Sequence, residues 1–91
     1  MIEVTRNDGR SRWEGRLDGE LVTVISFDRT GDVVDITYTG TKRRRRGQGL
    51  AGSVTKHALD DIRAEGWKVK PTCGFTASYL DELPEYDDLR M

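Results

Sequence analysis

The stretch KRRRRGQGLAG, Lys42–Gly52, places five consecutive cationic side chains directly before three glycines with the spacing G-x-G-x-x-G. The segment before it, VVDITYTG at residues 33–40, is rich in β-branched residues and predicts a strand. After Gly47 the apolar residues recur every three or four positions, which predicts a helix. The glycines therefore form a turn between the end of a strand and the start of a helix.

Downstream of this turn the pattern predicts a helix, a strand and a second helix. The apolar stripe of the first helix comprises Leu50, Ala51, Val54, Ala58, Leu59 and Ile62. Gly66 suits the left-handed backbone that ends such a helix. Residues 67–73 alternate as a strand, and because Pro71 has no N–H we expect pairing on one side to stop or bulge there. Residues 75–83 predict the second helix, which Pro84 terminates.

Upstream of the turn the sequence predicts an antiparallel meander of about four strands. The expected strands are residues 2–6, 12–17, 20–28 and 33–40. Asp18-Gly19 lies between the second and the third strand and is a strong signal for a two-residue hairpin, because both residues accept a positive φ. The element order ββββ-α-β-α predicts a single domain of the α+β (mixed α/β) class over residues 1–91.

Charge is distributed unevenly along the chain. Its 91 residues include 15 Lys and Arg against 16 Asp and Glu, for a formal net charge of -1. Five of the basic residues lie at positions 42–46, whereas the C-terminal segment DELPEYDDLRM carries five acidic residues against the single Arg90. This asymmetry predicts one anionic partner and one cationic partner.

Cysteine content and hydropathy exclude several classes of protein. The lone cysteine, Cys73, excludes an internal disulfide and a Cys-rich zinc site, and we expect no metal. No N-terminal segment has the apolar run of a signal peptide or a membrane span. We therefore expect a soluble cytoplasmic protein with no membrane partner.

Several interpretations of Lys42–Gly52 compete. A dinucleotide-binding site would need a parallel βαβ unit and an acidic residue about twenty positions further on, where this chain has only KVKPTCG. A Walker A loop is excluded because no Gly-Lys-Ser/Thr follows the glycines. A small nucleic-acid adaptor that uses residues 42–46 stays open, although no basic, aromatic-rich face accompanies the run. A solvated charged loop also stays open.

The interpretation that the residues favour is a phosphate cradle at the start of the helix. Glycines let the backbone approach a ligand closely, the first N–H groups of a helix are unpaired, and the helix dipole is positive there. Such a site binds a pyrophosphate without a side chain, and neighbouring Arg and Lys side chains hold a further phosphate.

At this point the residues resemble a known family. Arg44 to Gly49, RRRGQG, matches the Arg/Gln-x-x-Gly-x-Gly/Ala acetyl-CoA signature of the GNAT superfamily of N-acetyltransferases. Pro71-Thr72-Cys73, the aromatic helix after it and LPEYDDL at residues 83–89 look like the small single-domain members. The resemblance runs from about Glu20 to Leu89. It implies a mixed sheet in which the strands on either side of the motif helix splay apart, with the pantetheine arm of coenzyme A in the gap.

The resemblance also assigns binding residues. The backbone N–H groups that would cradle the pyrophosphate belong to Arg44, Arg45, Arg46, Gly47, Gln48 and Gly49. The strand end at Thr39, Gly40 and Thr41 would pair with the pantetheine amides. The subfamily usually has His-Thr-Glu where this chain has Tyr38-Thr39-Gly40, and a histidine where it has Leu83. Both departures remove an imidazole.

Two residues are candidates for catalysis. The resemblance puts Cys73 near the thioester, and because a thiol just before a helix N-terminus has a lowered pKa, Cys73 is the candidate for a covalent acetyl intermediate. The alternative is a small buried hydrophobe. Tyr79 is the candidate for protonating the departing thiolate, although its spacing with Phe75 also suits plain core packing, which we favour. His57 has no visible partner and is more consistent with a structural histidine.

The function implied is transfer of an acetyl group from acetyl-CoA to an amine. Larger members of the superfamily build an acceptor pocket from helices before the motif, for which this chain has little sequence. We therefore expect an open acceptor site and a polyamine or an accessible lysine as the acceptor. Two other functions stay open: a non-catalytic acetyl-CoA-binding module and the nucleic-acid adaptor.

Overall fold

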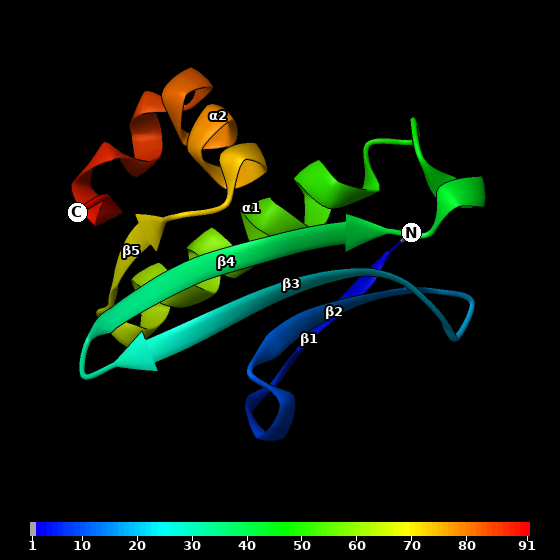
Figure 1. Ribbon diagram of the computed structural model, residues 1–91, viewed down its shortest axis with the longest axis horizontal. Helices are drawn as coiled ribbons and strands as arrows, with labels where there is room; N and C mark the ends of the chain where they lie inside the picture. The colour runs from blue at the N-terminus through cyan, green and yellow to red at the C-terminus, as the bar shows by residue number, and fades with distance from the viewer. Residues whose placement is uncertain (1) are drawn as a thin grey trace.

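Five strands form one sheet in the order β1-β2-β3-β4-β5 (Figure 1). In the computed structural model, which describes residues 2–91, these strands are β1 Glu3–Asn7, β2 Arg12–Leu17, β3 Glu20–Thr30, β4 Val33–Thr41 and β5 Lys68–Pro71. Met1, the first residue of the predicted domain, lies outside the described residues. Neighbouring strands from β1 to β4 are antiparallel, and β5 is parallel to β4. The predicted four-stranded meander is therefore confirmed.

Helices and short 3-10 turns connect and follow the strands. The elements are η1 Asp8–Arg10, η2 Arg43–Arg45, α1 Leu50–Glu65, α2 Gly74–Glu82 and η3 Pro84–Leu89. Gly66 ends α1 with φ 77°, and its N–H caps the carbonyls of Ile62 and Arg63, as predicted. Pro84 ends α2 as expected, but the chain continues directly into η3. Within residues 2–91 no helix has the length and apolarity that a membrane crossing requires.

The hairpin between β2 and β3 follows from its two turn residues. Asp18 and Gly19 have φ values of 50° and 84°, the left-handed backbone that a tight two-residue loop needs. The register then places Leu17 opposite Glu20. As a result, the start of β3 and the end of β4 lie at the same end of the sheet, because these strands are antiparallel neighbours.

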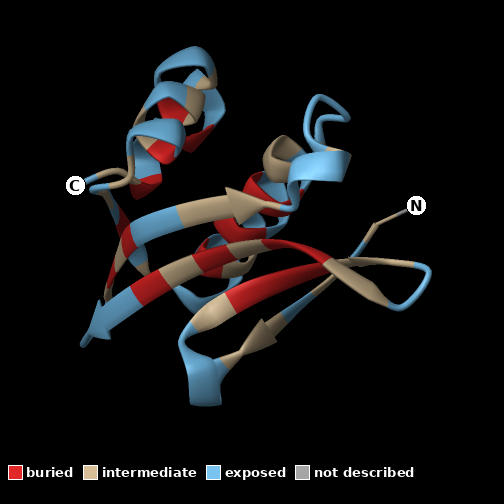
Figure 2. Ribbon diagram, turned by 45° about the vertical axis from the view of Figure 1, so that its right-hand side comes forward, coloured by how far each residue is buried: buried red, intermediate tan, exposed pale blue. Residues whose placement is uncertain are grey.

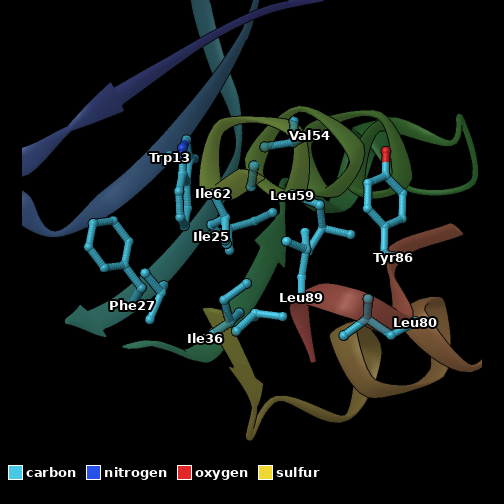
Figure 3. Close-up of a cluster of buried hydrophobic side chains, with 13 residues drawn as sticks. Trp13, Ile25, Phe27, Ile36, Val54, Leu59, Ile62, Leu80, Tyr86 and Leu89 are labelled. Carbon is cyan, nitrogen blue, oxygen red and sulfur yellow. The ribbon is translucent and has the colours of Figure 1, made fainter. Parts of the chain in front are cut away.

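The core lies between one face of the sheet and α1 (Figure 2). The predicted stripe residues Val54, Ala58, Leu59 and Ile62 are fully buried. They meet Ile25, Val34 and Ile36 of the sheet and, from the C-terminal segment, Leu80, Tyr86 and Leu89, and most of these side chains are drawn in Figure 3. Each buried aliphatic side chain of this kind contributes roughly 1.5–3 kcal/mol relative to an exposed one. The continuation into η3 thus brings Tyr86 and Leu89 into the core.

The two tryptophans have different environments. Trp13 is buried against Phe27, with ring centroids 4.6 Å apart, and its Nε1 donates to Asp61 at 2.9 Å. Trp67 is only half-buried, and the guanidinium groups of Arg6 and Arg29 lie 4.9 and 4.7 Å from its ring centroid. The prediction of core or sheet-face aromatics is confirmed for Trp13, and Trp67 packs at the margin of the core, where two cations also lie over its ring.

The sheet opens between β4 and β5. The paired register ends with Ile36 opposite Pro71, and the N–H of Cys73 makes the last link, to the carbonyl of Ile36 at 2.8 Å. The chain then turns away into α2, whereas β4 continues to Thr41 (Figure 1). The strand register thus ends at Pro71, where a stop or bulge was predicted, and only the bond from Cys73 follows it. The edge of β4 that faces away from β3 is open beyond Ile36.

Candidate functional site

A cleft of about 620 Å³ lies beside the open edge of β4. Its walls are the last four residues of β4 (38–41), the loop residues Arg45, Arg46, Gly47 and Gly49, the first three residues of α1 (50–52), and Phe75 of α2. The structure therefore brings together most of the residues predicted to hold the cofactor. Arg44 and Gln48, which were also predicted, do not line the cleft.

The open edge of β4 presents alternate backbone groups to this cleft. The N–H of Lys42 donates to the carbonyl of Val22 in β3 at 2.8 Å. Because alternate residues bond across an antiparallel pair, Gly40 also faces β3, and the backbone groups of Thr39 and Thr41 face the open edge. Arg46 Nε donates to the Thr41 carbonyl at 3.3 Å, which agrees with this orientation.

The start of α1 forms the opposite end of the cleft. Gly47 and Gly49 have φ values of 82° and 72°, a conformation that L side chains rarely adopt. The first intrahelical hydrogen bond runs from the Ser53 N–H to the Gly49 carbonyl at 3.1 Å. The N–H groups of the three residues 50–52 precede this bond and have no intrahelical acceptor. These N–H groups therefore lie at the cleft, together with the positive end of the helix dipole.

Two backbone amides of the arginine run are bonded within the run itself. The N–H groups of Arg45 and Arg46 donate to the carbonyls of Lys42 and Arg43 at 2.8 and 3.2 Å. The glycine-free run folds into the 3-10 turn η2, in which these N–H groups bond to carbonyls of the same turn. The amides of Arg45 and Arg46 are thus already bonded within η2, and their place in the predicted cradle stays a prediction.

Side chains of the run are partly neutralised by one carboxylate. Glu20, at the start of β3, pairs with Lys42 and Arg45 at 3.4 and 3.3 Å, and also with Arg44. The Nε atom of Arg45 is buried and has no hydrogen-bond acceptor within residues 2–91. An unsatisfied cationic donor in a cleft wall fits an anionic ligand, because a buried donor without an acceptor is costly.

Cys73 is the residue immediately before α2. Its side chain is half-buried, and Sγ lies 3.6 Å from the hydroxyl of Thr39 across the splay. Burial opposes ionisation of the thiol, but hydrogen bonds with Thr39 and with the backbone of Thr76 and Phe75 outweigh it and lower the pKa of Cys73. Thr39, predicted to pair with pantetheine, and Cys73, predicted to lie near the thioester, are therefore adjacent in space.

Tyr79 packs beside the start of α1 and does not line the cleft. Its ring stacks on Phe75 with centroids 6.3 Å apart, and it belongs to the shell around the core. A Cβ atom placed on Gly52 would lie 3.6 Å from its ring. Burial raises the pKa of the Tyr79 hydroxyl. These contacts agree with the packing role favoured from the sequence, while the catalytic role stays a prediction.

Three residues at this site were missed by the analysis of the sequence. Glu20 follows the Asp18-Gly19 turn, and the registers of the β2–β3 and β3–β4 hairpins together place it at the same end of the sheet as the basic run. Tyr38 and Phe75 are 56% and 43% exposed although both are large and aromatic. His57 lies elsewhere, in a separate hollow with Arg6, Trp13, Asp60 and Asp61.

Comparison with known proteins agrees with this geometry. A profile described as GCN5-related N-acetyl-transferase matches residues 12–89, from β2 through η3. The chain belongs to this family. Proteins named Protein NATD1 from Gallus gallus and Homo sapiens are each 32% identical over 89 residues. These alignments cover 93% of this chain and 81% and 79% of the two relatives.

Solved structures show the same GCN5-related fold. A GCN5-like protein from Staphylococcus aureus, determined in solution, superposes with a TM-score of 0.75 at 19% identity, covering 98% of this chain and 87% of that one. The ribosomal-protein-S18-alanine N-acetyltransferase from Escherichia coli gives a TM-score of 0.66 at 12% identity. That match covers 79% of this chain, which spans half the length of the enzyme. The predicted mixed fold and family resemblance are confirmed.

Proposed function

We propose that this GCN5-related protein binds acetyl-CoA in the cleft beside β4 and transfers the acetyl group to an amine. One observation carries the proposal: a single cleft combines an open strand edge, an uncapped helix N-terminus and a cationic wall. Acetyl-CoA is a substrate here and supplies the activated acetyl group.

Each part of the cleft matches one chemical part of that substrate. The N–H groups at the start of α1 bind the pyrophosphate, because unpaired amides and the helix dipole both favour an anion. Arg45 and Arg46 supply charge-assisted hydrogen bonds to phosphate oxygens. The backbone of Thr39 and Thr41 pairs with the pantetheine amides, as an added strand pairs with a sheet edge.

Cys73 does not itself line the cleft, but its Sγ lies 3.6 Å from the hydroxyl of Thr39, which does, and this contact supports a role at the acetyl end. Its thiolate attacks the thioester carbonyl carbon, so an S-acetyl bond forms on Cys73 and the coenzyme A thiolate leaves. The acceptor amine then attacks the acetyl carbon, its surplus proton passes to solvent water, and the amide bond forms as the carbon–sulfur bond breaks and releases the Cys73 thiolate. A lowered thiol pKa raises the fraction of nucleophile for the first step. Tyr79, the candidate proton donor to the leaving thiolate, acts in this scheme from α2.

The exposed aromatic residues support an open acceptor site. Tyr38 and Phe75 both line the cleft, from β4 and α2 respectively. Phe75 follows Cys73 by two positions, and Tyr38 precedes Thr39, so both belong to the acetyl end. Aromatic faces attract an ammonium group and pack on its alkyl chain. We propose a polyamine or an accessible lysine side chain as the acceptor.

A specific observation favours a second candidate, a non-catalytic acetyl-CoA-binding module. The residues that line the cleft in the described chain, 2–91, include neither a carboxylate nor an imidazole. An amine that must lose a proton on attack then has no general base in the cleft wall. A binding module needs no such base.

Thermal melts separate these functions. A ligand present at about 100 times its Kd adds about 2.7 kcal/mol to the free energy of unfolding, which raises the Tm by roughly 10–20 °C for a chain of this size. If the protein is an acetyltransferase or a non-catalytic binding module, acetyl-CoA and desulfo-CoA should raise its Tm in this way and short DNA should not. Release of free thiol with a panel of amines then distinguishes an enzyme from a module. A melt that is insensitive to millimolar acetyl-CoA would refute both.

A further inference from the structure

Glu20 places a negative charge beside the basic loop at residues 42–46. The β2–β3 hairpin and the loop after β4 meet at the same end of the sheet, since β3 begins where β4 ends. Five cationic side chains occupy consecutive positions 42–46 in that loop. Like charges at this spacing repel one another and favour an extended, disordered loop.

The contacts of Glu20 join that loop to the hairpin. Its two carboxylate oxygens pair with Lys42, Arg44 and Arg45, residues that flank or form η2. The Glu20 side chain is 26% exposed, less than any of its three partners. Because each exposed pair alone is weak, the effect arises from three cations that share one anion.

We propose that Glu20 is the positioning residue of the phosphate-binding loop, an inference that rests on the proposed acetyl-CoA function. By holding η2 closed, Glu20 keeps Arg45 and Arg46 in the cleft wall and the following glycine turn at the start of α1. The cofactor's phosphates therefore meet an ordered cradle. Without Glu20, the loop must be ordered during binding, and fixing even one residue costs about tenfold in affinity.

The sign of the effect distinguishes positioning from competition. If Glu20 merely occupied cations that phosphates need, its removal would free them and tighten binding. If Glu20 positions the loop, its removal weakens binding of ligands that carry phosphates and leaves the pantetheine end unaffected. The bound phosphates and Glu20 share the positive charge of the run, because three of its five cations pair with this one carboxylate.

The test compares Glu20→Gln with Glu82→Gln, which removes an exposed carboxylate at the end of α2. Hydrogen exchange of the ligand-free proteins measures the exchange rates of the Arg45 and Arg46 N–H groups. Because these groups are bonded within η2, their rates report whether the turn is formed. Calorimetry then measures binding of acetyl-CoA and of S-acetyl-pantetheine, which lacks all the phosphates.

The expected result is faster exchange at Arg45 and Arg46 and an acetyl-CoA Kd about tenfold higher in Glu20→Gln, equivalent to about 1.4 kcal/mol. Affinity for S-acetyl-pantetheine stays within about twofold, and Glu82→Gln behaves as wild type. Unchanged exchange in Glu20→Gln, or tighter acetyl-CoA binding, overturns the positioning role. Equal weakening for both ligands assigns Glu20 to general stability instead. If wild-type protein binds no acetyl-CoA while the exchange result holds, the proposed function fails but the loop contact stands.

Discussion

Replacement of Gly49 by alanine isolates the contribution of one backbone conformation. Gly49 caps α1 with φ 72° and ψ 14°, and a Cβ atom there meets no atom within 4 Å. The substitution therefore adds no clash, and its entire cost is the left-handed backbone, about 1–2 kcal/mol for an L residue. The free energy of unfolding falls by that amount, which corresponds to a Tm lower by roughly 4–16 °C.

Binding responds to the same change. If residue 49 relaxes toward negative φ, the turn rotates and the N–H groups at the start of α1 leave the cleft. We expect the Kd for acetyl-CoA to rise at least tenfold, or about 1.4 kcal/mol. Gly49→Asn loses less on both measures, because asparagine tolerates the left-handed region better than alanine.

Gly74→Ala is the matched control for stability. Gly74 is the first residue of α2, has no positive φ, and also leaves open space for a Cβ atom. Alanine there stabilises by about 0.4–1 kcal/mol, since it reduces the freedom of the unfolded chain. Urea unfolding and calorimetry on the three variants measure both quantities. Equal stability and equal affinity of Gly49→Ala and Gly74→Ala would refute the reasoning.

Three further predictions concern side chains. Because the pKa of Cys73 is lowered, the rate of its alkylation by iodoacetamide should reach half its maximum at a lower pH than in the urea-unfolded chain. Cys73→Ser should lose most of kcat, and an unchanged kcat would end the covalent route. Tyr38→Ala and Phe75→Ala should each raise KM for an amine acceptor several-fold without changing KM for acetyl-CoA, whereas a parallel rise in both would argue against an acceptor role. The hydrogen bond from Arg12 holds the pKa of Glu14 below its ordinary value of about 4.3. The ionised carboxylate therefore contributes its full stabilisation above that pH. This stabilisation is lost as the pH falls through the pKa of the folded state. Acid unfolding of Glu14→Gln should accordingly be less pH-dependent; identical profiles would contradict this.

Features set by local chemistry were predictable from the sequence. The Asp18-Gly19 hairpin and the end of α1 at Gly66 each depend on the φ range of one or two residues. The strand, turn and helix around the opening glycines followed from periodicity. These elements were enough to predict the splayed sheet through the family resemblance.

Features set by tertiary contacts were not predictable in the same way. The pairing of Glu20 with the basic run depends on the register of two hairpins, which residue patterns specify poorly. Residue patterns also did not reveal that the amides of Arg45 and Arg46 bond to carbonyls within η2. The continuation past Pro84 into η3 depends on the burial of Tyr86 and Leu89, which only the packed core provides.

Titration of isotope-labelled protein with acetyl-CoA, followed by amide NMR, tests the central claim most directly. The account predicts saturable shifts at Gly47, Gly49 and residues 50–52, together with Thr39 and Thr41 on the open edge of β4. Arg45 and Arg46 amides should shift less, since they are bonded within η2. An absence of shifts at millimolar acetyl-CoA, or shifts confined to the arginine side chains and reproduced by short DNA, would contradict it.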